Sequence, residues 1–191
     1  MMLGDDSLPS TFQVALRARI GWLCHLIRIA ALANALWILA SIAWYWSDSA
    51  AILQAYSRLL KADVSGVSTV QYAIALAGNL GFWSLQAAVS YCIWRQFGTY
   101  LQGRIFTVAA ATWMHRVGVA GLGALLFGLV WRHLIIIILA FHVPLPMSTL
   151  LAGPWAGTFD LLQAVFCLTV IGLAQIYNAA AEMVDDHAQI I

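Results

Sequence analysis

Four long runs of apolar residues dominate the chain, and each is long enough to cross a membrane. A helix needs about 20 apolar residues to span the hydrocarbon core of a bilayer. The runs predict membrane-spanning helices at about residues 29–46, 70–94, 117–141 and 159–177. Their apolar positions are continuous rather than alternating, which favours helices over the strands of a barrel. We therefore expect an all-α integral membrane protein whose 191 residues form a single membrane domain.

Two further segments have helical periodicity with one polar face, which is typical of helices that lie on a membrane surface. The first begins at the capping pattern of Ser10–Gln13, carries arginines on one face and is expected to turn into the first span near Ile29. The second follows that span, with Asp48 or Ser49 as its cap. Its apolar positions are Ile52, Leu53, Tyr56, Leu59 and Leu60. We expect four transmembrane helices with two interfacial amphipathic helices.

Composition narrows the class of protein. The chain is 63% hydrophobic and only 9% charged, whereas soluble domains carry roughly 25% charged residues. An ordinary soluble enzyme and a disordered chain are therefore excluded. The formal net charge is +1, and no basic patch is present, so nucleic acid is not expected as a partner. The lipid bilayer and other proteins remain as partners.

The placement of positive charges predicts the orientation in the membrane, because cytoplasmic loops are enriched in lysine and arginine. An even number of spans puts both termini on one side. That side collects Arg17, Arg19, Arg28, Arg95, Arg104 and Arg116. The other side has Arg58 and Lys61, with Arg132 close to it. We expect a multi-pass protein with both termini in the cytoplasm.

The segment between the second and third spans combines a turn with a helix cap. Gly103 permits a tight turn, and Thr107 is a good N-cap for a helix that begins at Val108. This helix should continue into the third span and exceed 30 residues. Its first part, Val108–Arg116, should protrude into the cytoplasm.

The same segment carries a sequence pattern, in which an aromatic residue precedes Gly-x-Ile-Phe-Thr before a third span. The matching residues are Tyr100, Gly103, Arg104, Ile105, Phe106 and Thr107, together with Gly118 at the start of the next span. The chain resembles a bacterial family of small four-span inner-membrane proteins of unknown function (DUF2975-like). The resemblance implies a protein of the bacterial inner membrane, and it supplies no catalytic residues. Some relatives are associated with small helix-turn-helix regulators, which implies a cytoplasmic protein partner.

Polar side chains within the spans require a partner or a purpose, because hydrocarbon solvates them poorly. Asn34 and Asn79 lie near the centres of the first two spans, and we expect a hydrogen bond between them. Arg132 lies inside the third span at a depth similar to that of Asp160 in the fourth, so the two are expected to form an ion pair. Helix pairing is the expected role of both pairs. A substrate or ion path is the alternative.

Two histidines allow a different interpretation. His25 and His115 should lie near the cytoplasmic ends of the first and third spans. A four-helix bundle can hold a b-type haem between two such histidines. Both residues adjoin basic positions, however, and this favours an interfacial location without a cofactor.

Close helix packing is predicted by small residues at intervals of four. The second span has Ala73, Ala77 and Gly81, and the third has Ala120, Ala124 and Gly128. Such residues let helices approach closely in lipid. They could serve packing within one chain or between copies in a homo-oligomer.

Enzymatic motifs are missing from the sequence, including phosphate-binding loops, HExxH and GxSxG. We expect a non-enzymatic accessory or partner-binding membrane subunit. Its docking surfaces would be Val108–Arg116 and the basic N-terminal helix. The alternatives are a haem-binding electron carrier and a small oligomeric transporter whose path is lined by Asn34, Asn79 and Arg132.

Overall fold

The computed structural model describes the backbone of residues 10–105, 107–143 and 157–188, and the side chains of residues 21–105, 107–143 and 157–183. The described part is helical, as expected. Its elements are α1 (Ser10–Trp46), α2 (Ser49–Leu60), α3 (Thr69–Leu101), α4 (Val108–Ala140) and α6 (Thr158–Ala188). Within these residues, four helices are long and apolar enough to cross a membrane, namely α1, α3, α4 and α6. The all-α membrane fold is thus confirmed, and each predicted span falls on one of these helices.

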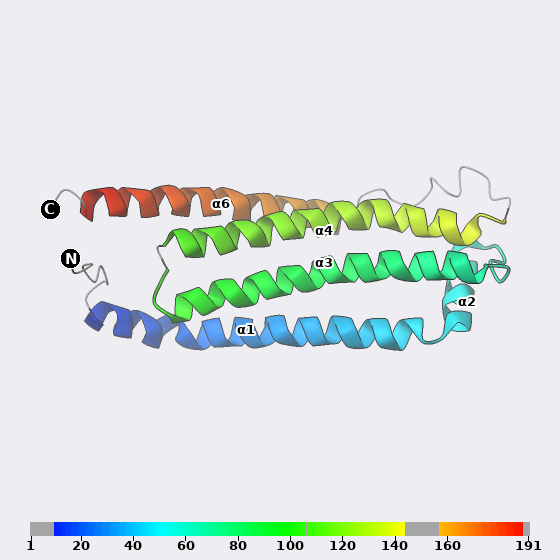
Figure 1. The fold of residues 1–191 in the computed structure, drawn as a ribbon, viewed down its shortest axis with the longest axis horizontal. Coiled ribbons are helices and arrows are strands. Elements are labelled where there is room, and N and C mark those ends of the chain that lie inside the picture. The colour runs from blue at the N-terminus through cyan, green and yellow to red at the C-terminus, as the bar shows by residue number, and fades with distance from the viewer. Residues whose placement is uncertain (1–9, 106, 144–156, 189–191) are drawn as a thin grey trace.

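The four long helices form a layer in which each packs on the next one along the chain. The extensive contacts are those of α1 with α3, α3 with α4, and α4 with α6. Figure 1 shows this order, with α1 and α6 at the two sides of the layer and α2 crossing one end. The start of α1 and the end of α6 are both at the opposite end, on the two sides of the layer. We name the two ends the α2 end and the Gly103 end, after the turn that joins α3 to α4.

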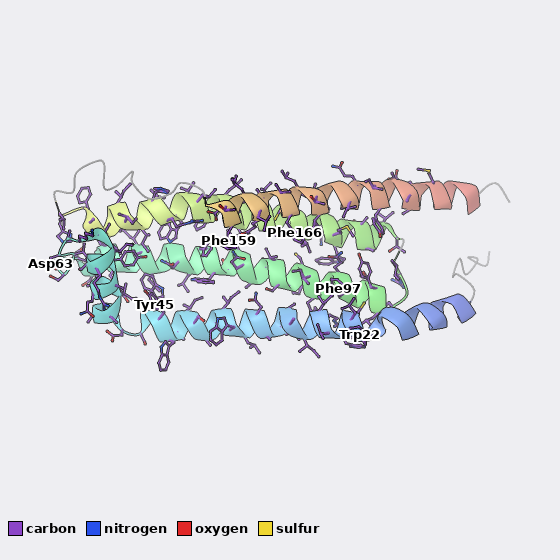
Figure 2. The ribbon with its side chains drawn as sticks, turned by 180° about the vertical axis from the view of Figure 1, so that it is seen from behind. Trp22, Tyr45, Asp63, Phe97, Phe159 and Phe166 are labelled. Atoms are coloured by element: carbon purple, nitrogen blue, oxygen red, sulfur yellow. The ribbon has the colours of Figure 1, made fainter. Side chains whose placement is uncertain are left out.

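Aromatic residues mark two levels along the layer. At the α2 end the rings of Trp46 and Tyr72 lie 5.4 Å apart, and the Tyr72 hydroxyl donates a hydrogen bond to the Trp46 carbonyl at 3.1 Å. Trp94 follows 22 residues after Tyr72 on α3, a rise of about 33 Å along a helix. This length matches the roughly 30 Å hydrocarbon core of a bilayer. Figure 2 shows Trp22 and Tyr45 towards opposite ends of the same segment of α1.

Glycines on α4 allow its backbone to approach both neighbours. A methyl group at Gly118 would lie 2.9 Å from the carbonyl oxygen of Cys167 on α6. A methyl group at Gly128 would lie 2.7 Å from the ring of Phe82 on α3. Gly128 belongs to the predicted row of small residues, and Ala124 in the same row is fully buried. Gly118, outside that row, is what brings α6 close.

The turn between α3 and α4 has the geometry that the sequence predicts. Gly103 has a φ of 80°, and its N–H bonds to the Tyr100 carbonyl while the Arg104 N–H bonds to the Thr99 carbonyl. This pair of bonds is a Schellman motif, which ends a helix and favours glycine. The Thr107 hydroxyl then accepts a hydrogen bond from the Ala110 N–H at 3.3 Å and caps α4. The predicted residue Phe106 lies outside the described residues.

Helix lengths and boundaries differ from expectation at the start of α1 and at the ends of α3 and α6, the last of which continues past residue 177 to Ala188. No turn separates the N-terminal segment from the first span, because α1 runs unbroken from Ser10 to Trp46. The sequence near Ile29 holds no proline, glycine or cap that could stop a helix. In addition, α3 extends past the predicted residue 94 to Leu101, beside the start of α4. Val108–Arg116 is therefore not a free protrusion, since Ala110 and Ala111 within it are buried.

The second expected amphipathic helix is present as α2. The Asp48 carboxylate accepts a hydrogen bond from the Ala51 N–H at 3.0 Å and caps the helix. Ile52 and Leu60 are buried, and Leu60 joins Val64 and Ala140 of α4 in a small apolar cluster. Thus α2 is anchored against the end of α4, while Arg58 and Lys61 stay exposed.

The packing of α4 on α6 can be tested with two glycines of the same helix. Gly118→Ala should destabilise the protein by about 1–3 kcal/mol, because the added methyl group meets the α6 backbone. Gly123→Ala is the control, since nothing lies within 4 Å of a methyl group at that position. The free energy of unfolding in mild-detergent micelles measures both. Equal effects of the two substitutions would contradict the assigned contact.

Candidate functional site

An ion pair joins α4 to α6 inside the membrane-spanning part of the layer. Arg132 Nη2 donates a hydrogen bond to Asp160 Oδ1 at 2.6 Å. Asp160 is 15% exposed and Arg132 is 51% exposed. The expected pairing of these two residues is thus confirmed. Among the described residues it is the one ion pair between side chains.

The position of Asp160 follows from the way α6 begins. Asp160 is the third residue of α6, and its Oδ2 accepts a hydrogen bond from the Gly157 N–H at 2.8 Å. A carboxylate at this position satisfies an N–H group that the helix leaves unbonded, and the helix dipole stabilises its charge. Both carboxylate oxygens therefore have partners. Arg132 uses one of the five N–H donors of its guanidinium in this pair.

The ion pair lies below the membrane surface because α6 begins part of the way along α4 (Figure 1). Arg132 precedes the end of α4 at Ala140 by eight residues, a rise of about 12 Å. At the end of α4, the Gln71 amide nitrogen donates a hydrogen bond to the Ile138 carbonyl and fixes the register with α3. The charges of Arg132 and Asp160 thus stand at a depth where ionised groups are rare and commonly functional.

A cavity of about 320 Å³ opens beside the ion pair. It lies among α2, α3, α4 and α6. Besides the ion pair, five of the side chains that line it carry a polar atom. These are Tyr56, Asn79, Gln86, Trp131 and Gln163. The Trp131 indole nitrogen is buried and has no hydrogen-bond partner. A buried N–H donor without an acceptor is rare in folded proteins, and this one belongs to a side chain that lines the cavity.

The side chain of Tyr56 brings a hydroxyl group to this cavity from α2. Burial, together with the nearby Tyr45, raises the pKa of Tyr56 to about 12. The phenol is therefore protonated at every physiological pH. The polar groups around the cavity are then Arg132, one phenol, one indole and three amides, with a single carboxylate that is already paired. This set suits a small solute with hydrogen-bond acceptors better than a cation.

The expected hydrogen bond between Asn34 and Asn79 is wrong. Asn34 donates to the Ser90 hydroxyl on α3 at 2.9 Å, whereas Asn79 donates to the Ala75 carbonyl of its own helix at 3.0 Å. The register of α1 on α3 places Asn34 beside Ser90 rather than beside Asn79. Asn79 is 11 residues from Ser90, about 16 Å along α3. Asn79 and Arg132 share the cavity, and Asn34 does not line it.

The histidine pair of the haem interpretation is not brought together in the described residues. His25 lies on α1 and His115 on α4, and both helices pack on α3. Both side chains are exposed, and His115 lines a shallow groove between α4 and α6. A haem clamp needs two histidines that face each other across one space, and this arrangement does not provide it.

Sequence reasoning missed Trp131, which supplies the buried donor of the cavity. Its position is set by Gly78 on α3, because a side chain at Gly78 would overlap the Trp131 ring. No local pattern distinguishes this tryptophan from the eight others in the sequence. Only the pairing of α3 with α4 reveals that its ring enters the layer.

The coupling between Arg132 and Asp160 can be measured with a double-mutant cycle. Either Arg132→Gln or Asp160→Asn leaves one charge without its partner, so each should lower the free energy of unfolding in detergent micelles. The loss of unfolding free energy in the double variant should be about 1–3 kcal/mol smaller than the sum of the losses in the two single variants. Arg132→Gln combined with Asp48→Asn is the control, because Asp48 caps α2 and its effect should add. An additive result for the first pair would show that the ion pair does not stabilise the fold.

Comparison of the chain with protein families, with curated proteins and with solved structures finds no match. The resemblance to the DUF2975-like family therefore stays a prediction from the sequence. What the protein does must be inferred from its own geometry.

Proposed function

We propose that the chain is a non-enzymatic membrane subunit that binds a transmembrane helix of another protein along the free side of α1. The observation that carries this proposal is the position of Trp37, whose side chain is 73% exposed. Nine residues separate it from Arg28 on one side and nine from Trp46 on the other, about 14 Å in each direction. Trp37 thus stands at the middle of the hydrocarbon.

An exposed tryptophan at this depth is unusual, because tryptophan concentrates at the two membrane surfaces where its N–H can reach water. Within the described residues, no acceptor lies in hydrogen-bond distance of the Trp37 indole. Asn34, one turn away, is also exposed, and its amide nitrogen is bonded to Ser90. An indole N–H and an amide oxygen at the mid-plane are suited to a partner helix with a polar side chain, since such groups join helices in lipid.

The arrangement of the layer supports the same function. Four-helix proteins commonly close into a bundle that buries all four helices about one core. Here α1 packs on α3 along one side through Cys24, Ala31 and Ile38, which are buried. Its other side presents large apolar side chains. Those most exposed are Trp22, Ile29, Leu36, Trp37 and Trp44.

The membrane and the orientation belong to the same proposal. Arg28, Arg95, Arg104 and Arg116 are at the Gly103 end, which the positive-inside rule assigns to the cytoplasm. Both termini would then be cytoplasmic, since α1 begins and α6 ends there (Figure 1). The resemblance noted above favours a bacterial inner membrane. A cytoplasmic regulator could dock on the outward side of Val108–Arg116 and on the start of α1.

The cavity beside Arg132 supports a second candidate function, which is the binding and passage of a small polar solute. Asn79 and Arg132 were both expected to line a transport path, and both line this cavity. The buried Trp131 donor is the specific observation in its favour. A cavity that takes a polar solute must also admit water.

The α1 proposal predicts a position-specific crosslink in the native membrane. A photoreactive amino acid in place of Trp37 should attach to one discrete protein. The same residue in place of Ile38 is the matched control, because Ile38 is 4% exposed and faces α3. An adduct of twice the chain mass would identify a second copy as the partner. Attachment of lipid alone at position 37 would contradict the proposal.

The transport candidate predicts that water reaches the cavity. Gln163→Cys should react with a membrane-impermeant methanethiosulfonate reagent added from the side of the α2 end. Phe166→Cys, three residues further along α6, should not react. Phe166 is outside the cavity lining, and its side chain, which is 64% exposed on a spanning helix, faces lipid rather than water. Mass spectrometry of the intact chain measures the labelling. Protection of both positions would exclude a water-filled cavity.

A further inference from the structure

Three arginines from three different helices lie against two tryptophan rings at the Gly103 end. The Arg28 guanidinium carbon on α1 is 4.5 Å from the centre of the Trp94 ring on α3. Those of Arg95 on α3 and Arg116 on α4 are 5.1 Å and 4.6 Å from the centre of the Trp113 ring. Tyr91 connects the two groups, because its ring contacts both Trp94 and Trp113. We name these residues the arginine–tryptophan surface.

The level of this surface matches the headgroup region of a bilayer. Trp94 lies about 33 Å along α3 from Tyr72, which is the thickness of the hydrocarbon. Tryptophan and arginine are both favoured there, since each has an apolar body and a polar end. The cation–π contacts hold each guanidinium beside a ring without using its N–H donors in a hydrogen bond. A guanidinium has five such donors, and those that reach the surface can bind oxygen atoms.

Positive charge at this surface is not balanced by the described carboxylates. No described Asp or Glu lies within ion-pair distance of Arg28, Arg95 or Arg116, and the ion pair of Arg132 is at the other level. The described carboxylate of α6 at this end, Glu182, accepts a hydrogen bond from Asn178. The Arg28 Nε is buried and has no acceptor. Three positive charges with no carboxylate partner among the described residues make this surface suited to an external anion.

We propose that the arginine–tryptophan surface binds the headgroup phosphate of an anionic phospholipid. Guanidinium groups bind phosphate oxygens with their planar N–H edges. Basic pockets between transmembrane helices at this level are suited to anionic headgroups. The aromatic rings beside the arginines distinguish a lipid from free phosphate, because they offer contact to the glycerol and upper acyl chain. The proposal is independent of the partner of α1.

Native mass spectrometry of the full-length chain in mild detergent tests this site, with phosphatidylglycerol and phosphatidylcholine as the two probes. The protein should bind phosphatidylglycerol more tightly. Each arginine replaced by glutamine should weaken that binding about fivefold, so Arg28→Gln, Arg95→Gln and Arg116→Gln together should weaken it about 100-fold. Arg58→Gln is the control, because Arg58 is exposed at the α2 end and bonds to Gln54 of its own helix. It should leave binding unchanged.

Two further measurements keep the test decisive. If the triple glutamine variant does not fold, Arg95→Gln alone serves, since Arg95 is exposed, and it should still weaken binding about fivefold. Replacement of the three arginines by lysine should retain the preference for phosphatidylglycerol, because the charge is kept. Equal binding of the two lipids, or no change in the glutamine variants, would overturn the proposal. Complete displacement of the lipid by inorganic phosphate would assign the site to free phosphate instead.

Discussion

Close backbone contact along α4 is the interaction on which the rest of the structure depends. Lipid tails are as apolar as the helices, so burial of apolar side chains does not drive α3, α4 and α6 together. Dispersion contacts must do so, and they need short distances. Gly118 allows α4 to approach α6 closely, and Gly128 allows it to approach α3. The depth of Asp160, the position of Trp131 and the shape of the cavity all follow from how near α4 lies to its neighbours.

Local sequence signals were sufficient for much of this fold. The spans, the stop at Gly103 and the cap at Thr107 depend on residues close together in the chain, and each is confirmed. The pairing of Arg132 with Asp160 could also be predicted, because two opposite charges at similar depth in hydrocarbon are poorly solvated unless they pair. The haem arrangement required His25 and His115 to face each other, and the order of the helices keeps them apart.

The prediction of a hydrogen bond between two spans failed because it depended on helix register. Asn34 and Asn79 both lie near the middle of their spans, but hydrogen bonding requires agreement within one turn. The register of α1 on α3 instead places Asn34 beside Ser90, which is 11 residues from Asn79. The orphan indole of Trp131 and the arginine–tryptophan contacts escaped notice for the same reason. Each depends on residues of different helices, and no spacing within one helix predicts a contact between helices.

The order in which the helices pack has a consequence for biosynthesis. Each long helix rests on the one made just before it, so α3 finds α1, α4 finds α3, and α6 finds α4. Contacts between segments that are near in sequence form fast, because little chain must be closed into a loop. The layer can therefore grow by one helix at a time as the chain enters the membrane. After α1, each long helix finds its first partner already in the membrane, and α1 keeps one side open from the start.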